Sequence, residues 1–161
     1  MATVTATIRV ADSYDDGWWS EYDQDFQRRS QYGAAGWWYA DYGPTNTYAR
    51  FIVSLPEDAP IASAKLIFTA RYSSGDIPTL YTRIRAVAAD NAAAPASYAD
   101  AENATRTTAY VDWNISDPWS SQVEYESPDI SAVIQEIRDR PGWAEGNAIV
   151  VYWEYVGEDL G

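Results

Sequence analysis

Short runs in which polar and apolar residues alternate, each ended by turn residues, limit the fold of this chain more than any other feature. Alternation with a period of two puts every second side chain on one face of a β-strand. The last such run is so rich in apolar residues that we expect both of its faces to be covered. Short strands separated by turns are typical of an antiparallel β-sandwich, in which two sheets bury their inner faces. The runs cover residues 4–10, 49–55, 64–70, 81–88, 108–113 and 148–155.

One segment has the period of a helix instead. Ser127 is suited to cap a helix, Pro128 to occupy its first position, and Pro141 to end it. The pattern predicts a short α-helix over about residues 127–140, whose single apolar stripe closes one end of the sandwich. The residues of this stripe are Ile130, Val133, Ile134 and Ile137.

The composition removes most catalytic and metal chemistries. The 161 residues include no Cys and no His, which excludes disulfides, thiolate nucleophiles, imidazole bases and Cys/His zinc sites. A net charge of −13 argues against nucleic-acid binding, because that affinity depends on clustered Lys and Arg. No apolar run approaches the roughly 20 residues that span a bilayer, so we expect no membrane insertion. Since no linker or repeat divides the chain, residues 1–161 are expected to form a single domain.

The stretch from Asp12 to Asn46 is the least strand-like part of the chain and the richest in aromatic residues. Loops of this length are usually functional or disordered, and disordered segments are poor in aromatics, so we expect a long ordered excursion. Three interpretations stay open: an interface with another macromolecule, packing against the edge of the core, and a platform on which sugars stack. The candidate contact residues for a partner or glycan are Trp18, Trp19, Trp37, Trp38, Tyr39 and Tyr42.

The same stretch carries a cluster of carboxylates. Calcium takes about 6–8 oxygen ligands and tolerates irregular geometry, so the cluster is a candidate calcium site. Its spacing is not that of an EF-hand loop, and the alternative is that these groups are solvated or pair with Arg28 and Arg29. We expect no other cofactor. Nothing selects a glycosidase pair among the 24 acidic residues, so we expect no enzymatic activity. The candidate metal ligands are Asp12, Asp15, Asp16 and Asp23.

The order of segments in the last third of the chain is distinctive. A strand ends at Trp113, a short strand precedes Ser127, the predicted helix follows, and Gly142-Trp143 and Gly146-Asn147 introduce a final strand. This order resembles jelly-roll modules of the DNRLRE-like, carbohydrate-binding-module type, found in bacterial surface proteins and in virion proteins of tailed phages. The resemblance covers about residues 60–156 and implies a non-catalytic jelly-roll β-sandwich. Because the chain before residue 48 has more Trp and Tyr than such modules, the resemblance assigns no ligand residue there.

These features favour a non-enzymatic structural or adhesion protein of a phage virion, either a capsid decoration protein or a minor tail protein. The expected partners are neighbouring virion subunits or further copies of the chain on a lattice, contacted through residues 12–46. The alternative is a carbohydrate-binding module that stacks surface glycans on exposed Trp and Tyr rings. The N-terminus lacks a charged region followed by an apolar one, so we expect synthesis in the cytoplasm without a signal peptide, followed by assembly into the virion.

Overall fold

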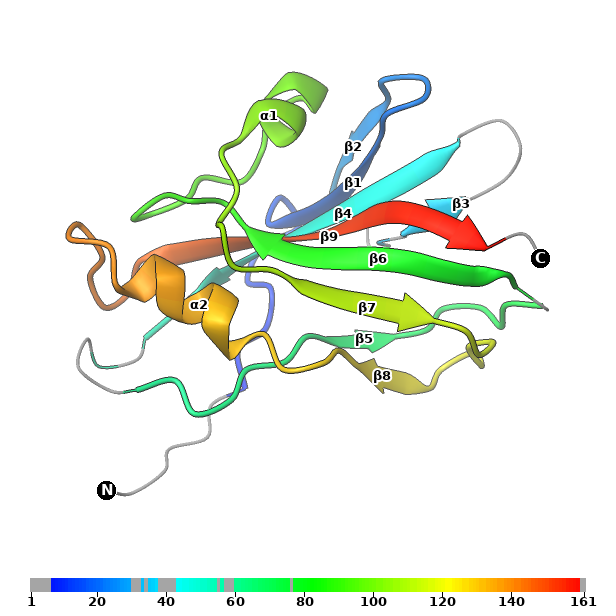
Figure 1. The fold of residues 1–161 in the computed structure, drawn as a ribbon. Helices are drawn as coiled ribbons and strands as arrows, with labels where there is room; N and C mark the ends of the chain where they lie inside the picture. The colour runs from blue at the N-terminus through cyan, green and yellow to red at the C-terminus, as the bar shows by residue number, and fades with distance from the viewer. Residues whose placement is uncertain are drawn as a thin grey trace.

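The computed structural model describes residues 7–29, 33, 35–37, 43–54, 56, 60–75 and 77–159. Over these residues the chain forms two antiparallel β-sheets and two short helices, which confirms the predicted all-β sandwich (Figure 1). The strands are β1 (Asp16–Ser20), β2 (Phe26–Arg28), β3 (Gly36–Trp37), β4 (Pro44–Ile52), β5 (Ile67–Thr69), β6 (Thr79–Ala86), β7 (Val111–Ile115), β8 (Glu124–Glu126) and β9 (Ala148–Asp159). The helices are α1 (Tyr98–Asn103) and α2 (Ser131–Arg138).

The two layers of the sandwich are unequal in size. Among the described residues, the main sheet has seven strands in the order β2-β1-β4-β9-β6-β7, with β3 also paired to β4, and the second sheet is the pair β5-β8. The pair β5-β8 and helix α2 lie on one side of the main sheet, which we call its inner face (Figure 1). Helix α1 lies on the opposite side, the outer face.

Strand β9 runs through the middle of the main sheet, between β4 and β6. Its residues from Ala148 to Glu154 are all buried, so both faces of this strand are covered as its apolar sequence predicts. Alternate side chains serve different cores: Val151 and Trp153 join the inner core, whereas Val150 and Tyr152 join a smaller core beneath α1.

Helix α2 begins later than the sequence predicts, at Ser131 rather than near Ser127. The Ser127 hydroxyl does not cap the helix, because it accepts a hydrogen bond of 3.0 Å from the backbone N–H of Leu66. The Asp129 carboxylate likewise accepts from the N–H of Ala64, at 2.9 Å, as well as from that of Ser131. The residues before α2 are therefore hydrogen-bonded to the segment that precedes β5.

The structure differs from the sequence analysis in two further places. Helix α1 was not predicted, because its sequence has no strong apolar period. It starts at a local capping signal, since the side chain of Ser97 accepts a hydrogen bond from the backbone N–H of Asp100. In the run over residues 4–10, the described residues 7–10 form no strand, and residues 4–6 lie outside the described part of the chain. Of the two helices among the described residues, neither has the length and apolar character needed to cross a membrane.

Candidate functional site

The sequence predicts that residues 12–46 form an excursion from the sandwich. The structure corrects this prediction, because the described residues of the stretch supply β1, β2, β3 and the start of β4. Strand β1 pairs with β2 on one side and with β4 on the other. Gly17 permits this close packing, since a Cβ atom there would lie 2.4 Å from the Gln27 carbonyl oxygen and 2.7 Å from the Tyr48 ring. The aromatic stretch is thus part of the main sheet.

The predicted contact residues Trp18 and Trp19 are buried, with only 7% and 0% of their surface exposed. The Trp19 ring packs 4.9 Å from the ring of Tyr152, and its indole N–H donates to the Glu102 carboxylate at 3.0 Å. The prediction that these two residues present ring faces to a partner or glycan is therefore wrong, and core packing describes them. The backbone of Trp37 lies in β3; its side chain, and residues Trp38, Tyr39 and Tyr42, lie outside the described part of the chain.

The carboxylates proposed as calcium ligands do not converge. Asp15 forms an ion pair of 3.1 Å with Arg50, and Asp12 accepts a hydrogen bond from the backbone N–H of Tyr14. A hydrogen bond from the Ser20 hydroxyl lowers the pKa of Asp23, whereas burial raises the pKa of Asp16. Among the described residues, no group of three or more acidic side chains is placed to hold a metal ion.

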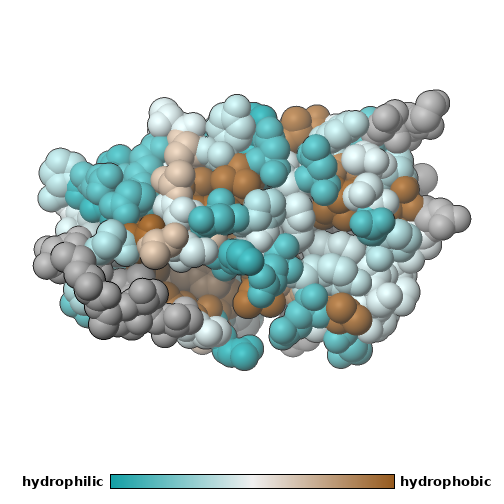
Figure 2. Space-filling model, turned by 60° about the horizontal axis from the view of Figure 1, so that its bottom comes forward, coloured by the Kyte–Doolittle hydropathy of each residue, from teal (hydrophilic) through white to brown (hydrophobic). Residues whose placement is uncertain are grey.

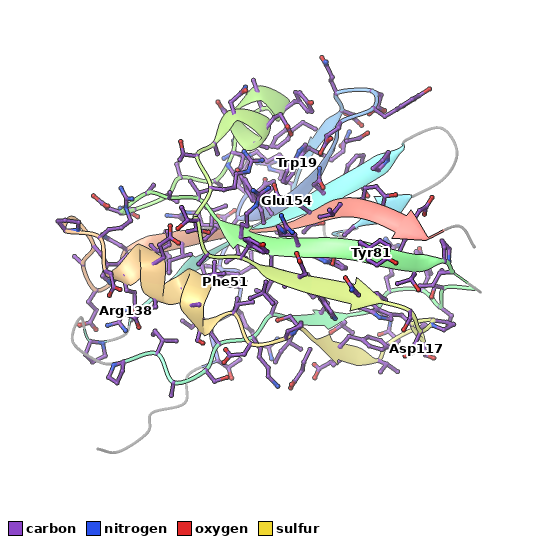
Figure 3. All side chains as sticks on the ribbon, viewed as in Figure 1. Trp19, Phe51, Tyr81, Asp117, Arg138 and Glu154 are labelled. Atoms are coloured by element: carbon purple, nitrogen blue, oxygen red, sulfur yellow. The ribbon has the colours of Figure 1, made fainter. Side chains whose placement is uncertain are left out.

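A polar cleft of about 520 Å³ lies on the outer face of the main sheet, beside α1. Its floor comes from β6 and β9, and α1 with the segment after it forms one wall. We call it the outer-face cleft. In Figure 3, Trp19 and Glu154 lie on the same side of the main sheet as α1, whereas Phe51 and Arg138 lie on the side of α2. The cleft is lined by Glu21, Arg83, Arg85, Glu102, Arg106, Glu154, Tyr155 and Val156.

Glu154 is the central charge of this cleft, and only 7% of it is exposed. Its two carboxylate oxygens bind different guanidinium groups: Arg85 Nε at 2.7 Å and Arg106 Nε at 3.2 Å. Arg106 is held further by hydrogen bonds to the carbonyl oxygens of Glu102 and Ala104, and its guanidinium lies 4.9 Å from the centre of the Tyr152 ring. These contacts hold the three charged side chains in a defined arrangement.

Two further carboxylates border the cleft and have neutral partners. Glu21 accepts a hydrogen bond of 2.9 Å from the side-chain amide of Asn46, and Glu102 accepts the one from the Trp19 indole. No described cation lies within ion-pair distance of either carboxylate. Burial raises the pKa of the nearby Tyr98 phenol, and the charges of Glu102 and Glu21 raise it further. Both carboxylates therefore act on the same region of the surface.

Aromatic rings flank the cleft at Arg83. This residue makes a two-pronged contact with Asp112 on the neighbouring strand, at 2.7 and 3.2 Å. Its guanidinium also lies 3.9 Å from the centre of the Tyr110 ring. Tyr81 precedes Arg83 by two residues on β6 and so emerges on the same face. Both tyrosines are exposed, which leaves ring surface available next to the polar groups.

Sequence reasoning did not find this cleft. The one local signal was the alternation of Arg83 and Arg85 with Ile84, which places the two arginines on the face opposite the inner core. Their partners lie far away in the sequence, because Glu154 is 69 residues from Arg85 and 48 residues from Arg106. Only strand pairing and the position of α1 bring these groups together.

The opposite side of the molecule has a different character. Figure 2 shows the side that carries β5 and β8, where hydrophobic and hydrophilic residues are interspersed. Among the described residues of the visible surface, the hydrophobic groups form separate islands and not one broad patch.

The chain matched no protein-family model and none of the curated proteins with which it was compared. The functional assignment therefore depends on the geometry of the molecule, and the resemblance to DNRLRE-like modules stays a prediction.

Proposed function

We propose that this protein is a non-catalytic adhesion module that binds saccharides in the outer-face cleft. The observation that carries the proposal is the fixed arrangement of Arg85, Glu154 and Arg106 in a solvent-accessible hollow. A sugar hydroxyl donates one hydrogen bond and accepts others, so it is best met by donors and acceptors side by side, which guanidinium and carboxylate groups supply. The exposed rings of Tyr81 and Tyr110 add apolar surface of the kind that packs against a sugar ring.

The energetics of the charged cluster support a role in binding. Removing charges from water is unfavourable, and well-packed apolar residues often replace a buried ion cluster with no loss of stability. The inner core covers the other face of β6 and β9 without these three side chains, so we expect the sheet to fold when apolar residues replace them. Their position at the floor of a solvent-accessible cleft therefore supports a role in binding.

The position of the cleft favours a saccharide over an extended peptide. A peptide commonly binds a sheet by adding a strand to an open edge. Strands β6 and β9 have neighbours on both sides, since β6 lies between β9 and β7, and β9 lies between β4 and β6. The floor therefore presents side chains and no free backbone edge, which suits a ligand recognised through its hydroxyl groups.

A titration with neutral sugars tests the proposal. We would record backbone and arginine side-chain NMR spectra with lactose, maltose, cellobiose and diacetylchitobiose, and expect saturable shifts at cleft residues with at least one of them. The variant Arg85→Gln should weaken that binding by about tenfold, because it removes a charged donor. The matched control is Arg140→Gln, since Arg140 pairs with Asp90 outside the cleft, and this variant should bind as the unaltered protein does. Absence of binding by all four sugars would contradict the proposal.

A second candidate, docking to neighbouring virion subunits, is favoured by the open end of the main sheet. Strand β2 is the terminal strand in the sheet order, and no described strand pairs with its outer edge. Edge strands present unpaired backbone groups that another chain can bind. Next to this edge the guanidinium groups of Arg28 and Arg29 lie 4.6 and 3.6 Å from the centre of the exposed Tyr14 ring, and Tyr22 is 71% exposed.

Particles produced with and without this protein would test the second candidate. Mass spectrometry should detect the protein in purified virions, and the substitution Tyr22→Glu should reduce its incorporation while leaving the isolated protein folded. The matched control Tyr72→Glu alters a similarly exposed tyrosine elsewhere on the surface and should leave incorporation unchanged. Purified virions that lack the protein would exclude this candidate.

A further inference from the structure

We infer that the outer-face cleft selects uncharged saccharides, and that Glu21 and Glu102 are the residues that reject acidic ones. This inference depends on the proposed saccharide binding and adds the class of sugar and the groups that determine it.

The first argument is the pairing of charges. Arg83 is neutralised by Asp112, and Arg85 shares Glu154 with Arg106. Glu21 and Glu102, in contrast, have only the neutral partners Asn46 and Trp19. The three guanidinium groups are therefore accompanied by four carboxylates, and the two charges without an ion-pair partner among the described residues are both negative.

The second argument concerns the donors left for a ligand. Arg83 directs both Nε and one Nη to Asp112, and Arg106 directs Nε to Glu154 and an Nη to backbone carbonyl oxygens. Arg85 uses Nε for Glu154, and its Nη groups bind no described residue. Arg85 thus keeps both of its Nη groups for a ligand, whereas Arg83 and Arg106 keep one Nη group each, so among the three only Arg85 can offer two Nη groups to a ligand carboxylate.

The third argument concerns the effect of the Glu21 and Glu102 carboxylates on a sugar carboxylate bound in the same cleft as Arg85. A hydroxyl group can donate a hydrogen bond to Glu21 or Glu102, but an ionised carboxylate has no proton to donate and is repelled. Glu21 and Glu102 line the same cleft as Arg85, so a ligand carboxylate held there would face both charges. The net charge of −13 adds a longer-range repulsion of anions.

Matched pairs of sugars test the inference. The probes are the methyl glycosides of glucose, galactose and mannose, each compared with its uronate, in which a carboxylate replaces the C6 hydroxymethyl group. NMR titrations at neutral pH give both affinities. We expect the uronate of any glycoside that binds to bind at least about tenfold more weakly, as like-charge juxtaposition predicts.

The double variant Glu21→Gln, Glu102→Gln assigns the selectivity to these residues. Glutamine keeps an oxygen that accepts from Asn46 and from Trp19, so the fold should be retained, and the NMR spectrum checks this. We expect the affinity of the variant for the uronate to come within about threefold of its affinity for the neutral glycoside, so that the ratio of the two affinities is the readout. The matched control is Glu126→Gln, because Glu126 pairs with Lys65 on the second sheet, and this variant should keep the original preference.

The possible results separate the two proposals. If the neutral glycosides bind and the uronates bind as well or better, the inference is wrong while saccharide binding stands. If the preference is present but unchanged in the double variant, the assignment to Glu21 and Glu102 is wrong. If neither the disaccharides nor the glycosides bind, saccharide binding itself fails, and the inference fails with it.

Discussion

The two faces of the main sheet use the same strands for different purposes. On the inner face, Val151 and Trp153 of β9 pack with apolar residues of β5, β7 and α2. On the outer face of the same strand, Tyr152 lies beneath α1 and Glu154 lies at the floor of the cleft. The larger apolar core therefore lies on the inner face, and the part of the outer face beside α1 carries the polar outer-face cleft.

Aromatic residues show the same contrast. On the inner side, the rings of Phe68, Trp113, Trp119 and Trp153 contact one another, with centroids 4.7–6.0 Å apart. On the outer side, the Tyr152 ring contacts Trp19 and faces the guanidinium of Arg106. Aromatic packing consolidates the inner layer, whereas on the outer layer it supports charged groups. Five predictions follow from these differences, beginning with the largest expected effect.

The substitution Trp153→Ala tests the inner face. Trp153 contacts three aromatic rings, and its indole N–H donates to the Thr82 hydroxyl at 2.8 Å. Loss of the side chain leaves a cavity and an unpaired hydroxyl acceptor, so we expect a loss of about 4 kcal/mol in the free energy of unfolding. Urea denaturation followed by circular dichroism measures it. A loss below about 1 kcal/mol would show that the aromatic cluster is not central to stability.

Two sets of substitutions test the outer face. Glu154→Gln leaves two guanidinium groups without their shared anion. We expect a loss of about 2 kcal/mol in the free energy of unfolding, which is less than for a fully buried ion pair because water still reaches the two arginines. The combined replacement Arg85→Met, Glu154→Leu and Arg106→Met should instead match or exceed the stability of the unaltered protein, since apolar packing replaces costly desolvation. Saccharide binding should be lost in the combined variant. Strong destabilisation of that variant would mean that the charges hold the fold together.

The substitution Trp19→Phe separates a core role from a contact role. Trp19 is buried and donates to Glu102, so Phe should reduce the free energy of unfolding by about 1.5 kcal/mol through lost packing and one lost hydrogen bond. Denaturation in urea provides the measurement. An exposed contact residue would tolerate the same change with unaltered stability, and that result would restore the interpretation based on the sequence.

The smallest effects concern pH. Burial alone would raise the pKa of Glu136 on α2, but hydrogen bonds from the backbone N–H groups of Ala109 and Thr108 outweigh it and lower that pKa. The folded-state pKa is then below the unfolded value, so the contribution is present above the ordinary glutamate range near about 4.3 and is lost as the pH falls. As the pH is lowered from neutral to acidic, the urea concentration at the midpoint of unfolding should fall less for the variant Glu136→Gln than for the unaltered protein.

Asp16 on β1 should behave in the opposite way. Burial and the charge of Asp15 raise the pKa of Asp16, so its ionised form opposes folding at neutral pH, and protonation relieves this as the pH falls through the raised folded-state value. The variant Asp16→Asn should therefore be at least as stable as the unaltered protein at neutral pH and lose stability more steeply in acid. The same urea titration compares both variants, and equal slopes would contradict this account.

Sequence reasoning performed well where a local pattern was sufficient. The apolar spacing of Ile130, Val133 and Ile137 predicted the helix, and these three side chains are buried as expected. The start of that helix was misplaced because Ser127 and Asp129, both good capping residues, have hydrogen-bond partners near β5. A capping preference describes what a residue can do, whereas a competing partner from another strand decides what it does.

The sequence by itself determined an all-β chain with one clear helix, free of Cys and His chemistry, because alternation and composition are local properties. Only the tertiary structure decided that Trp18 and Trp19 belong to the core and that Glu154 lies between two arginines. Which strands become neighbours, and in which register, depends on contacts between residues far apart in the chain. The outer-face cleft, which is lined by residues between 21 and 156, is therefore a property of strand order, which no short segment specifies.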